Sequence, residues 1–166
     1  MWIRNWRSLG LALAAMAFAA WLPGSSVQAQ TVSKPAKSAA AAKSKMTHKI
    51  AIQVSENDKN VMNRALNNTK NLIEFYKAKG QNAVVEIVTF HDGLHMLRSE
   101  SPVKDRIAVM SLENPNLTFV ACANTQANQS KAEGKPVTLL SEAKVMPSGI
   151  VRLIELQNQG YAYIRP

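Results

Sequence analysis

Residues 117–125 read LTFVACANT. The first six are apolar or β-branched, which predicts a strand that is buried on both faces. Asn124 and Thr125 follow at once, and short polar side chains of this kind favour the start of a helix. A buried strand that leads directly into a helix is typical of a parallel α/β sheet, in which a helix follows each strand. This stretch therefore indicates the fold class.

The same alternation of strand and helix extends along the chain in both directions. Further strands are predicted over residues 48–54, 83–90, 143–146 and 161–164, and helices run to about Lys79 and over 94–99, 102–112, 124–131 and 149–159. Gly80 and Gly160 are expected to end two of the helices. We predict one α/β domain over residues 48–166, with a three-layer, mostly parallel, five-stranded, Rossmann-like sheet flanked by helices.

The first 29 residues have the pattern of a secretory signal peptide. Arg4 and Arg7 begin it, residues 9–22 are an apolar run, and residues 27–29 read VQA, with small side chains where signal peptidase requires them. We expect cleavage after Ala29 and a periplasmic or secreted product. The apolar run is shorter than the roughly 20 residues of a spanning helix, so no stable membrane insertion is expected after cleavage. The alternative is an uncleaved anchor.

Residues 30–47 are expected to form a flexible linker rich in Ala, Lys and Ser. The formal net charge of the chain is +9, but two arginines of the signal and four lysines of the linker contribute six of these charges. The domain therefore has an ordinary mixed surface, without a cluster of basic and aromatic residues. We expect no nucleic-acid partner.

Polar residues and glycines follow the predicted strands where a parallel sheet forms its binding sites. Right-handed crossovers bring the carboxyl ends of all the strands to one edge, and four strand-to-helix turns are expected to meet there. The candidate ligand-binding residues in these turns are Asn57, Asp92, Gly93, Asn124, Thr125, Ser148 and Gly149. The Asn, Thr and Ser residues are also good helix caps, so capping alone is their alternative role.

Cys122 is the only cysteine of the chain and the candidate nucleophile. It ends a predicted strand just before a helix, and the positive end of a helix dipole stabilises a thiolate. His91, in another turn at the same edge, is the candidate base or hydrogen-bond partner. The alternative is that Cys122 fills the core, since cysteine is among the most buried residue types.

We expect neither a cofactor nor a metal. The turn after the first strand reads SENDKN, which is not a glycine-rich phosphate loop, and no serine nucleophile elbow is present. His91 and His95 have a metal-ligand spacing, but Gly93 interrupts it and no third ligand accompanies them. Without a complete set of acid, base and nucleophile, the sequence leaves open whether the protein is an enzyme.

The domain resembles the DsrE/DsrF-like (YchN-like) family over residues 48–166. The segments that carry the resemblance are, in order, HKIAIQVSEND, ALNNTKNLIEFY, VTFHDGLHML, SPVKDRIAVM, FVACANT, VMPSGIVRLIELQNQG and YAYIRP. The resemblance implies a five-stranded parallel α/β fold that is often assembled as trimers or hexamers. It also implies a sulfur carrier, in which a cysteine takes up a persulfide and exchanges it with a donor or acceptor protein.

The chain departs from this family in two respects. Cys122 matches the cysteine of an ACxNT strand motif, but the relay cysteine of the well-studied carriers follows an earlier strand, where this chain has FHDGL at 90–94. Those carriers are cytoplasmic, whereas this chain is expected to enter an oxidising compartment. Two hypotheses remain. The domain either binds or transfers sulfur through Cys122, or it is a non-catalytic oligomeric module that binds a small ligand or a protein and has a structural cysteine.

Overall fold

The computed structural model describes residues 46–166. The expected signal peptide and nearly all of the expected linker lie outside the described residues. The elements are β1 (Thr47–Val54), α1 (Lys59–Ala78), β2 (Asn82–Thr89), the 3₁₀ helix η1 (His91–Leu97), α2 (Lys104–Glu113), β3 (Leu117–Cys122), α3 (Ala123–Glu133), β4 (Ala143–Met146), α4 (Gly149–Asn158) and β5 (Ala162–Ile164). Each strand and helix predicted from the sequence is present, with small shifts at its ends.

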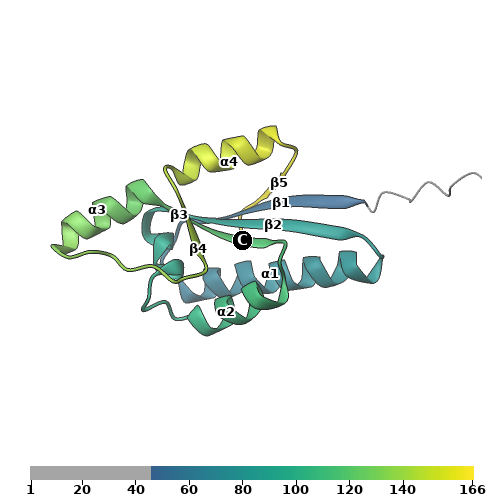
Figure 1. Ribbon diagram of the computed structural model, residues 1–166, viewed down its shortest axis with the longest axis horizontal. Coiled ribbons are helices and arrows are strands. Elements are labelled where there is room, and N and C mark those ends of the chain that lie inside the picture. The colour runs from purple at the N-terminus through teal and green to yellow at the C-terminus, as the bar shows by residue number, and fades with distance from the viewer. Residues whose placement is uncertain (1–45) are drawn as a thin grey trace, which may run out of the picture. The chain divides into compact units, whose positions relative to one another are not determined.

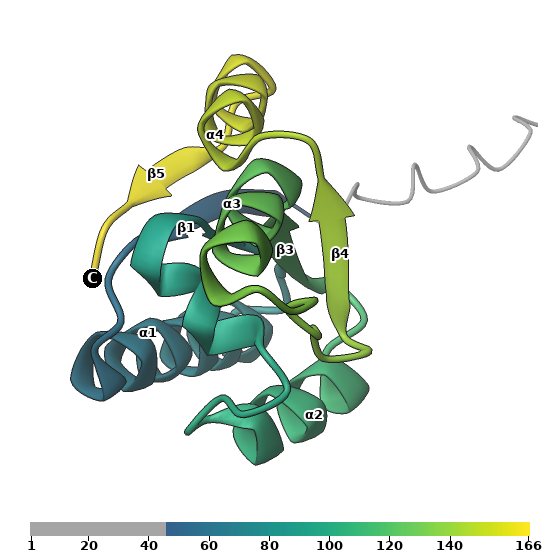
Figure 2. The ribbon, with the colours of Figure 1, turned by 90° about the vertical axis from the view of Figure 1, so that its left-hand side faces the viewer.

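The five strands form one sheet in the order β4-β3-β2-β1-β5, and every pair is parallel. Helices α1 and α2 lie on one face of the sheet and α4 lies on the other, while α3 extends beyond the end where the strands finish (Figure 1). Figure 2, viewed from that end, shows α3 and η1 in front of the strands. This arrangement confirms the predicted three-layer α/β fold. None of the helices between residues 46 and 166 has the length and apolar character of a membrane span.

Two apolar clusters hold the layers together. The larger one lies between the sheet and the helices α1, α2 and η1, and it includes Met62, Leu66, Ile107 and Phe119. The smaller cluster lies between the sheet and α4; it consists of Ala51, Val88, Phe90, Val120, Cys122, Leu153 and Leu156. Cys122 is therefore part of the core that attaches α4 to the sheet.

The helix after β2 begins earlier than the sequence predicted. We expected a helix over 94–99, but η1 starts at His91, directly after the strand. The reason is a close contact with β1: a Cβ atom on Gly93 would lie 2.3 Å from the carbonyl oxygen of Val54. Because only a glycine can approach a backbone so closely, the chain turns tightly here and leaves no room for a separate loop.

A buried ion pair also connects α4 to the sheet. Glu86 lies in the middle of β2, and its side chain is 8% exposed. Arg152 of α4 donates two hydrogen bonds to its carboxylate, from Nε to Oε1 at 2.5 Å and from Nη2 to Oε2 at 2.8 Å. Planar bidentate pairing of this kind fixes the orientation of both side chains. The pair therefore determines where α4 lies on the sheet.

We expect Arg152→Met to lower the free energy of unfolding by about 3–5 kcal/mol, because it leaves the Glu86 carboxylate buried without its partner. Replacing both residues, as Glu86→Leu with Arg152→Met, removes the unpaired charge and is expected to restore most of this loss. Urea unfolding, followed by circular dichroism, measures the free energy of unfolding of the single and the double variant. A single Arg152→Met variant as stable as the wild type would show that the pair does not hold α4.

Candidate functional site

Cys122 is the last residue of β3 and the N-cap residue of α3. It is 5% exposed and packs in the smaller apolar cluster. The thiol is therefore held between the core under α4 and the first turn of α3. Such a position suits either a structural cysteine or a sheltered nucleophile, and the polar groups around the sulfur distinguish the two.

The Sγ atom of Cys122 lies 4.0 Å from the carbonyl oxygen of Pro147, to which the thiol donates. The Thr125 hydroxyl and the backbone N–H groups of Gly149, Thr125 and Asn124 also lie close enough to the sulfur to influence its pKa. Asn124 and Thr125 are in the first turn of α3, and Gly149 is the first residue of α4. The positive ends of two helix dipoles therefore meet at one sulfur atom.

These donors determine the acidity of the thiol. Burial raises the pKa of Cys122, because a charged sulfur would lose its contact with water. The hydrogen bonds from the Thr125 hydroxyl and the three backbone N–H groups lower that pKa, and they outweigh the burial, so the net shift is downward. The site thus makes Cys122 a stronger acid than a free cysteine, and the thiolate is the nucleophilic form of cysteine.

Thr125 is oriented toward Cys122 by a residue of another turn. The backbone N–H of His91 donates to Oγ1 of Thr125 at 3.1 Å. Since this oxygen already accepts a hydrogen bond, the hydroxyl proton remains available for the sulfur of Cys122. The contact between His91 and the site is thus made by its backbone and passes through Thr125.

His91 has an unusual backbone conformation. Its φ is 48°, the one positive value among the non-glycine residues that the structure describes. Both backbone groups of His91 are bound by α3, since its N–H donates to Thr125 and its carbonyl oxygen accepts from Nε2 of Gln129 at 3.1 Å. A strained residue persists only where its surroundings hold it, so His91 and α3 fix each other's position.

A second glycine makes the site possible. A Cβ atom on Gly149 would lie 2.8 Å from a ring carbon of Phe90. The absence of a side chain lets the start of α4 approach Phe90, the residue that follows β2, and this brings the N–H of Gly149 close to Cys122. Ser148 caps α4 by accepting a hydrogen bond from the N–H of Val151, as the sequence predicted.

The structure corrects the expectation for the start of α3. Asn124 and Thr125 were predicted to cap this helix, but Cys122 occupies the cap position, and both residues lie within the first turn. Thr125 is the third residue of the helix, and its hydroxyl oxygen instead accepts a hydrogen bond from the N–H of His91. The backbone N–H of Asn124 also donates to the carbonyl oxygen of Pro147 at 3.3 Å, which joins the turns that follow β3 and β4.

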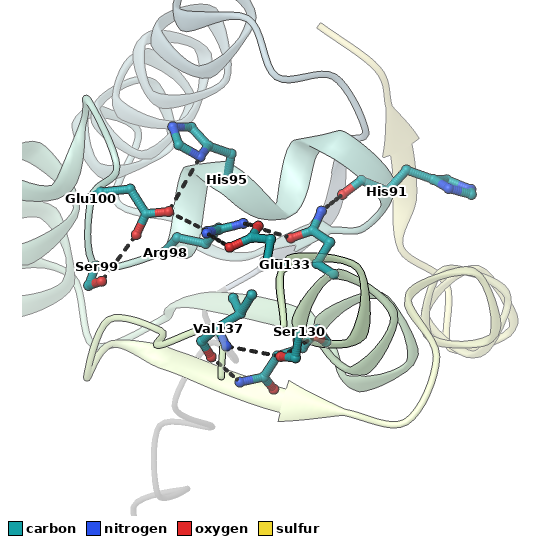
Figure 3. Close-up of polar contacts among 10 residues, drawn as sticks. His91, His95, Arg98, Ser99, Glu100, Ser130, Glu133 and Val137 are labelled. Atoms are coloured by element: carbon teal, nitrogen blue, oxygen red, sulfur yellow. Dashed lines mark hydrogen bonds and ion pairs between the residues drawn. The ribbon is translucent and has the colours of Figure 1, made fainter. Parts of the chain in front are cut away.

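The remaining predicted residues are not among the groups that surround Cys122. Asn57 is exposed on the turn after β1 and Asp92 is exposed on η1, while Gly93 serves the contact of η1 with β1 described above. His91 begins η1, His95 lies further along it, and their side chains point away from each other (Figure 3). Within residues 46–166 no group of three or more His, Cys, Asp or Glu side chains is placed to hold a metal ion.

Comparisons with known proteins support the fold. No protein-family model matches the chain, and no curated protein is similar to it. A solved structure described as a protein of unknown function, MTH1491 from Methanobacterium thermoautotrophicum, is similar, with a TM-score of 0.61 and 26% sequence identity. The match covers 72% of this chain and 99% of that one. The class of protein is thus a parallel α/β domain, and its function has to be argued from the site.

Sequence reasoning missed several residues that support the site. Arg98 forms a polar cluster with Gln129 and Glu133 of α3, at the end of that helix remote from Cys122, and Pro147 supplies the carbonyl that joins two turns. No signal along the chain marks them, because Arg98 and Glu133 are 35 residues apart. Pairing over such a distance depends on how the elements pack.

We expect Thr125→Val to make Cys122 a weaker acid, because the variant loses the hydroxyl that donates to the sulfur. The rate of alkylation by iodoacetamide at neutral pH should fall by about tenfold, the effect of one hydrogen bond to a charged group. Thr125→Ser should retain most of the reactivity. Thr118→Val, a half-buried change in β3, is the matched control. Equal pH–rate profiles for Thr125→Val and the wild type would exclude this role of Thr125.

Proposed function

We propose that the protein is an exported DsrE/DsrF-like domain that binds or transfers sulfur through Cys122. One observation carries the proposal: Cys122 is the N-cap residue of α3, beside the start of α4, and the hydrogen-bond donors gathered there lower its pKa despite its burial. A structural cysteine in an apolar core needs none of these donors. A sulfur nucleophile needs them, because they stabilise the negative charge that it carries before and after the reaction.

The chemistry of uptake requires only the thiolate and a sulfur donor. The Cys122 thiolate attacks a sulfur atom of an inorganic polysulfide, a new S–S bond forms, and a polysulfide shorter by one sulfur leaves with the electron pair of the broken bond. The product is a persulfide anion on Cys122. The N–H groups of Asn124, Thr125 and Gly149 remain close to that anion, so the site can hold the product as well as the nucleophile.

Release of the sulfur requires an external acceptor, since the chain has a single cysteine. An acceptor thiolate attacks the outer sulfur of the persulfide, and the Cys122 thiolate leaves. A thiol of lowered pKa is a better leaving group, so the same hydrogen bonds that favour uptake also favour transfer. We therefore infer that a donor or acceptor of sulfur, small molecule or protein, binds at this strand end.

A second candidate function is a non-catalytic oligomeric module. It is favoured by the exposed face of α4, on which Ile150, Val151 and Ile154 are each about half exposed. Apolar residues gathered on one helix face are typical of contacts between proteins. In this function the face of α4 binds another subunit, and Cys122 only fills the core beneath that helix.

Mass spectrometry after treatment with polysulfide distinguishes the two functions. We expect the native wild-type protein to gain the mass of one sulfur atom on Cys122 and to lose it again on addition of a small thiol. Cys122→Ser gains nothing and serves as the control. If native Cys122 gains no sulfur and resists alkylation, while the urea-unfolded protein is alkylated readily, the sulfur function is wrong and the structural role is supported.

A further inference from the structure

Helix α3 is attached to the domain in an unusual way. It has eleven residues, none of which is buried. By contrast, α1 buries five residues, among them Met62 and Leu66, and α4 buries Leu153 and Leu156. Since burial of apolar side chains is what normally fixes a helix on a sheet, α3 is held in place mainly by polar contacts.

The strongest of these contacts lies at the end of α3 remote from Cys122. Arg98, which follows η1, forms a bidentate ion pair with Glu133, with Nη1 to Oε1 at 2.5 Å and Nη2 to Oε2 at 3.0 Å. The Nη1 atom is also 3.3 Å from Oε1 of Gln129. Arg98 is 14% exposed, and Glu100 pairs with its Nε atom. Figure 3 shows Glu133 of α3 against the guanidinium of Arg98, with Glu100 and His95 on the other side.

Further polar contacts hold the middle of the helix. Nε2 of Gln126 donates to the carbonyl oxygen of Val137 at 2.9 Å, and the N–H of Val137 donates to Oγ of Ser130 at 2.9 Å. Gln129 donates to the carbonyl oxygen of His91. These bonds connect α3 with the loop that follows it and with η1. The ion pair of Arg98 is the one contact of this group in which both partners are charged.

We propose that the ion pair between Arg98 and Glu133 is a positioning device, which holds α3 over the strand end so that its first turn stays beside Cys122. The inference concerns the site on which the proposed function rests. It assigns Arg98 and Glu133 as positioning residues, because they act on the sulfur through α3 and do not touch it.

The geometry of the helix explains how a contact at its far end affects the sulfur. The first residue of α3 is joined covalently to Cys122, so the direction of the helix is set by the contacts along the rest of it, of which the ion pair of Glu133 lies farthest from the sulfur. With eleven residues and a rise of about 1.5 Å for each, α3 is about 16 Å long. When the far end is released, the first turn tilts, and the N–H groups of Asn124 and Thr125 move away from Sγ.

The cost of this movement is small, because few apolar contacts are lost. A segment with little buried apolar surface opens locally at a lower free energy than the core. Arg98 holds the pKa of the Glu133 carboxyl below its usual range, chiefly by the hydrogen bond between them. The pair is therefore charged at neutral pH. Opening of α3 therefore has two consequences. Reagents reach the sulfur of Cys122 more easily, and the thiolate of Cys122 is stabilised less.

Glu133→Ala is the variant that tests the device, because alanine keeps the helix and removes only the partner of Arg98. Asn128→Ala, at an exposed position of the same helix, is the matched control. Arg98→Lys is the second variant, which keeps the charge and loses the bidentate geometry. The alkylation rate of Cys122 is measured against pH in the full-length protein as it is isolated, and hydrogen exchange of the α3 amides is measured in parallel.

We expect Glu133→Ala to raise the limiting alkylation rate at high pH by about two- to fivefold, the range for a partly exposed ion pair. The pH at the inflection of the alkylation profile should rise toward that of a free thiol. The amides of α3 should exchange their hydrogens faster. Arg98→Lys should show smaller shifts in the same directions, and Asn128→Ala should match the wild type. A change in helix stability alone would alter hydrogen exchange without moving the inflection of the pH profile.

The device is overturned if Glu133→Ala has the pH profile of the wild type, or if its limiting rate rises without a shift of the inflection. The test of the positioning device and the test of the proposed sulfur function can give different results. If wild-type Cys122 takes up no sulfur from polysulfide while Glu133→Ala shifts the alkylation profile, the positioning device is supported and the sulfur function fails. If sulfur is taken up and no shift occurs, the function is supported and the device is wrong.

Discussion

The parallel register of β3 and β4 is the constraint on which the site depends. Cys122 is paired with Met146, so the two strands end side by side. The helices that follow them therefore begin at the same edge, and their first N–H groups point toward one place. Because an amide at a helix start has no partner within its own helix, it can bond outside that helix, as the N–H of Asn124 does to the carbonyl oxygen of Pro147. The strand pairing thus brings the N–H of Gly149 close to the sulfur of Cys122, a residue 27 positions earlier in the chain.

Cys122 has two different environments, and the difference between them is what makes it a candidate for chemistry. On one side it packs with Phe90 and the apolar residues under α4. On the other side lies the first turn of α3, a helix that buries no side chain. The apolar side fixes the position of the sulfur, and the polar side determines its charge. A core cysteine enclosed on all sides by apolar groups would have a raised pKa and would be unreactive.

The sequence predicted the elements well because their signals are local. Apolar runs indicated the buried strands, Gly80 and Gly160 mark two helix ends in the left-handed conformation, and Ser148 is a cap as expected. The start of α3 was wrong, because Asn124 and Thr125 have the composition of caps but are used inside the helix. Capping propensity describes an isolated helix, whereas here the N–H of His91, from another turn, competes for the Thr125 hydroxyl.

The sequence by itself determined the class of sheet, the edge at which a site would form and Cys122 as its candidate nucleophile. These follow from the spacing of apolar residues and from the way parallel strands connect. Only the tertiary structure decided that Gly149 would approach Phe90, that His91 would orient Thr125, and that Arg98 would hold α3 through Glu133. The physical reason is that each of these contacts joins residues distant in sequence, whose meeting depends on the packing of the whole domain.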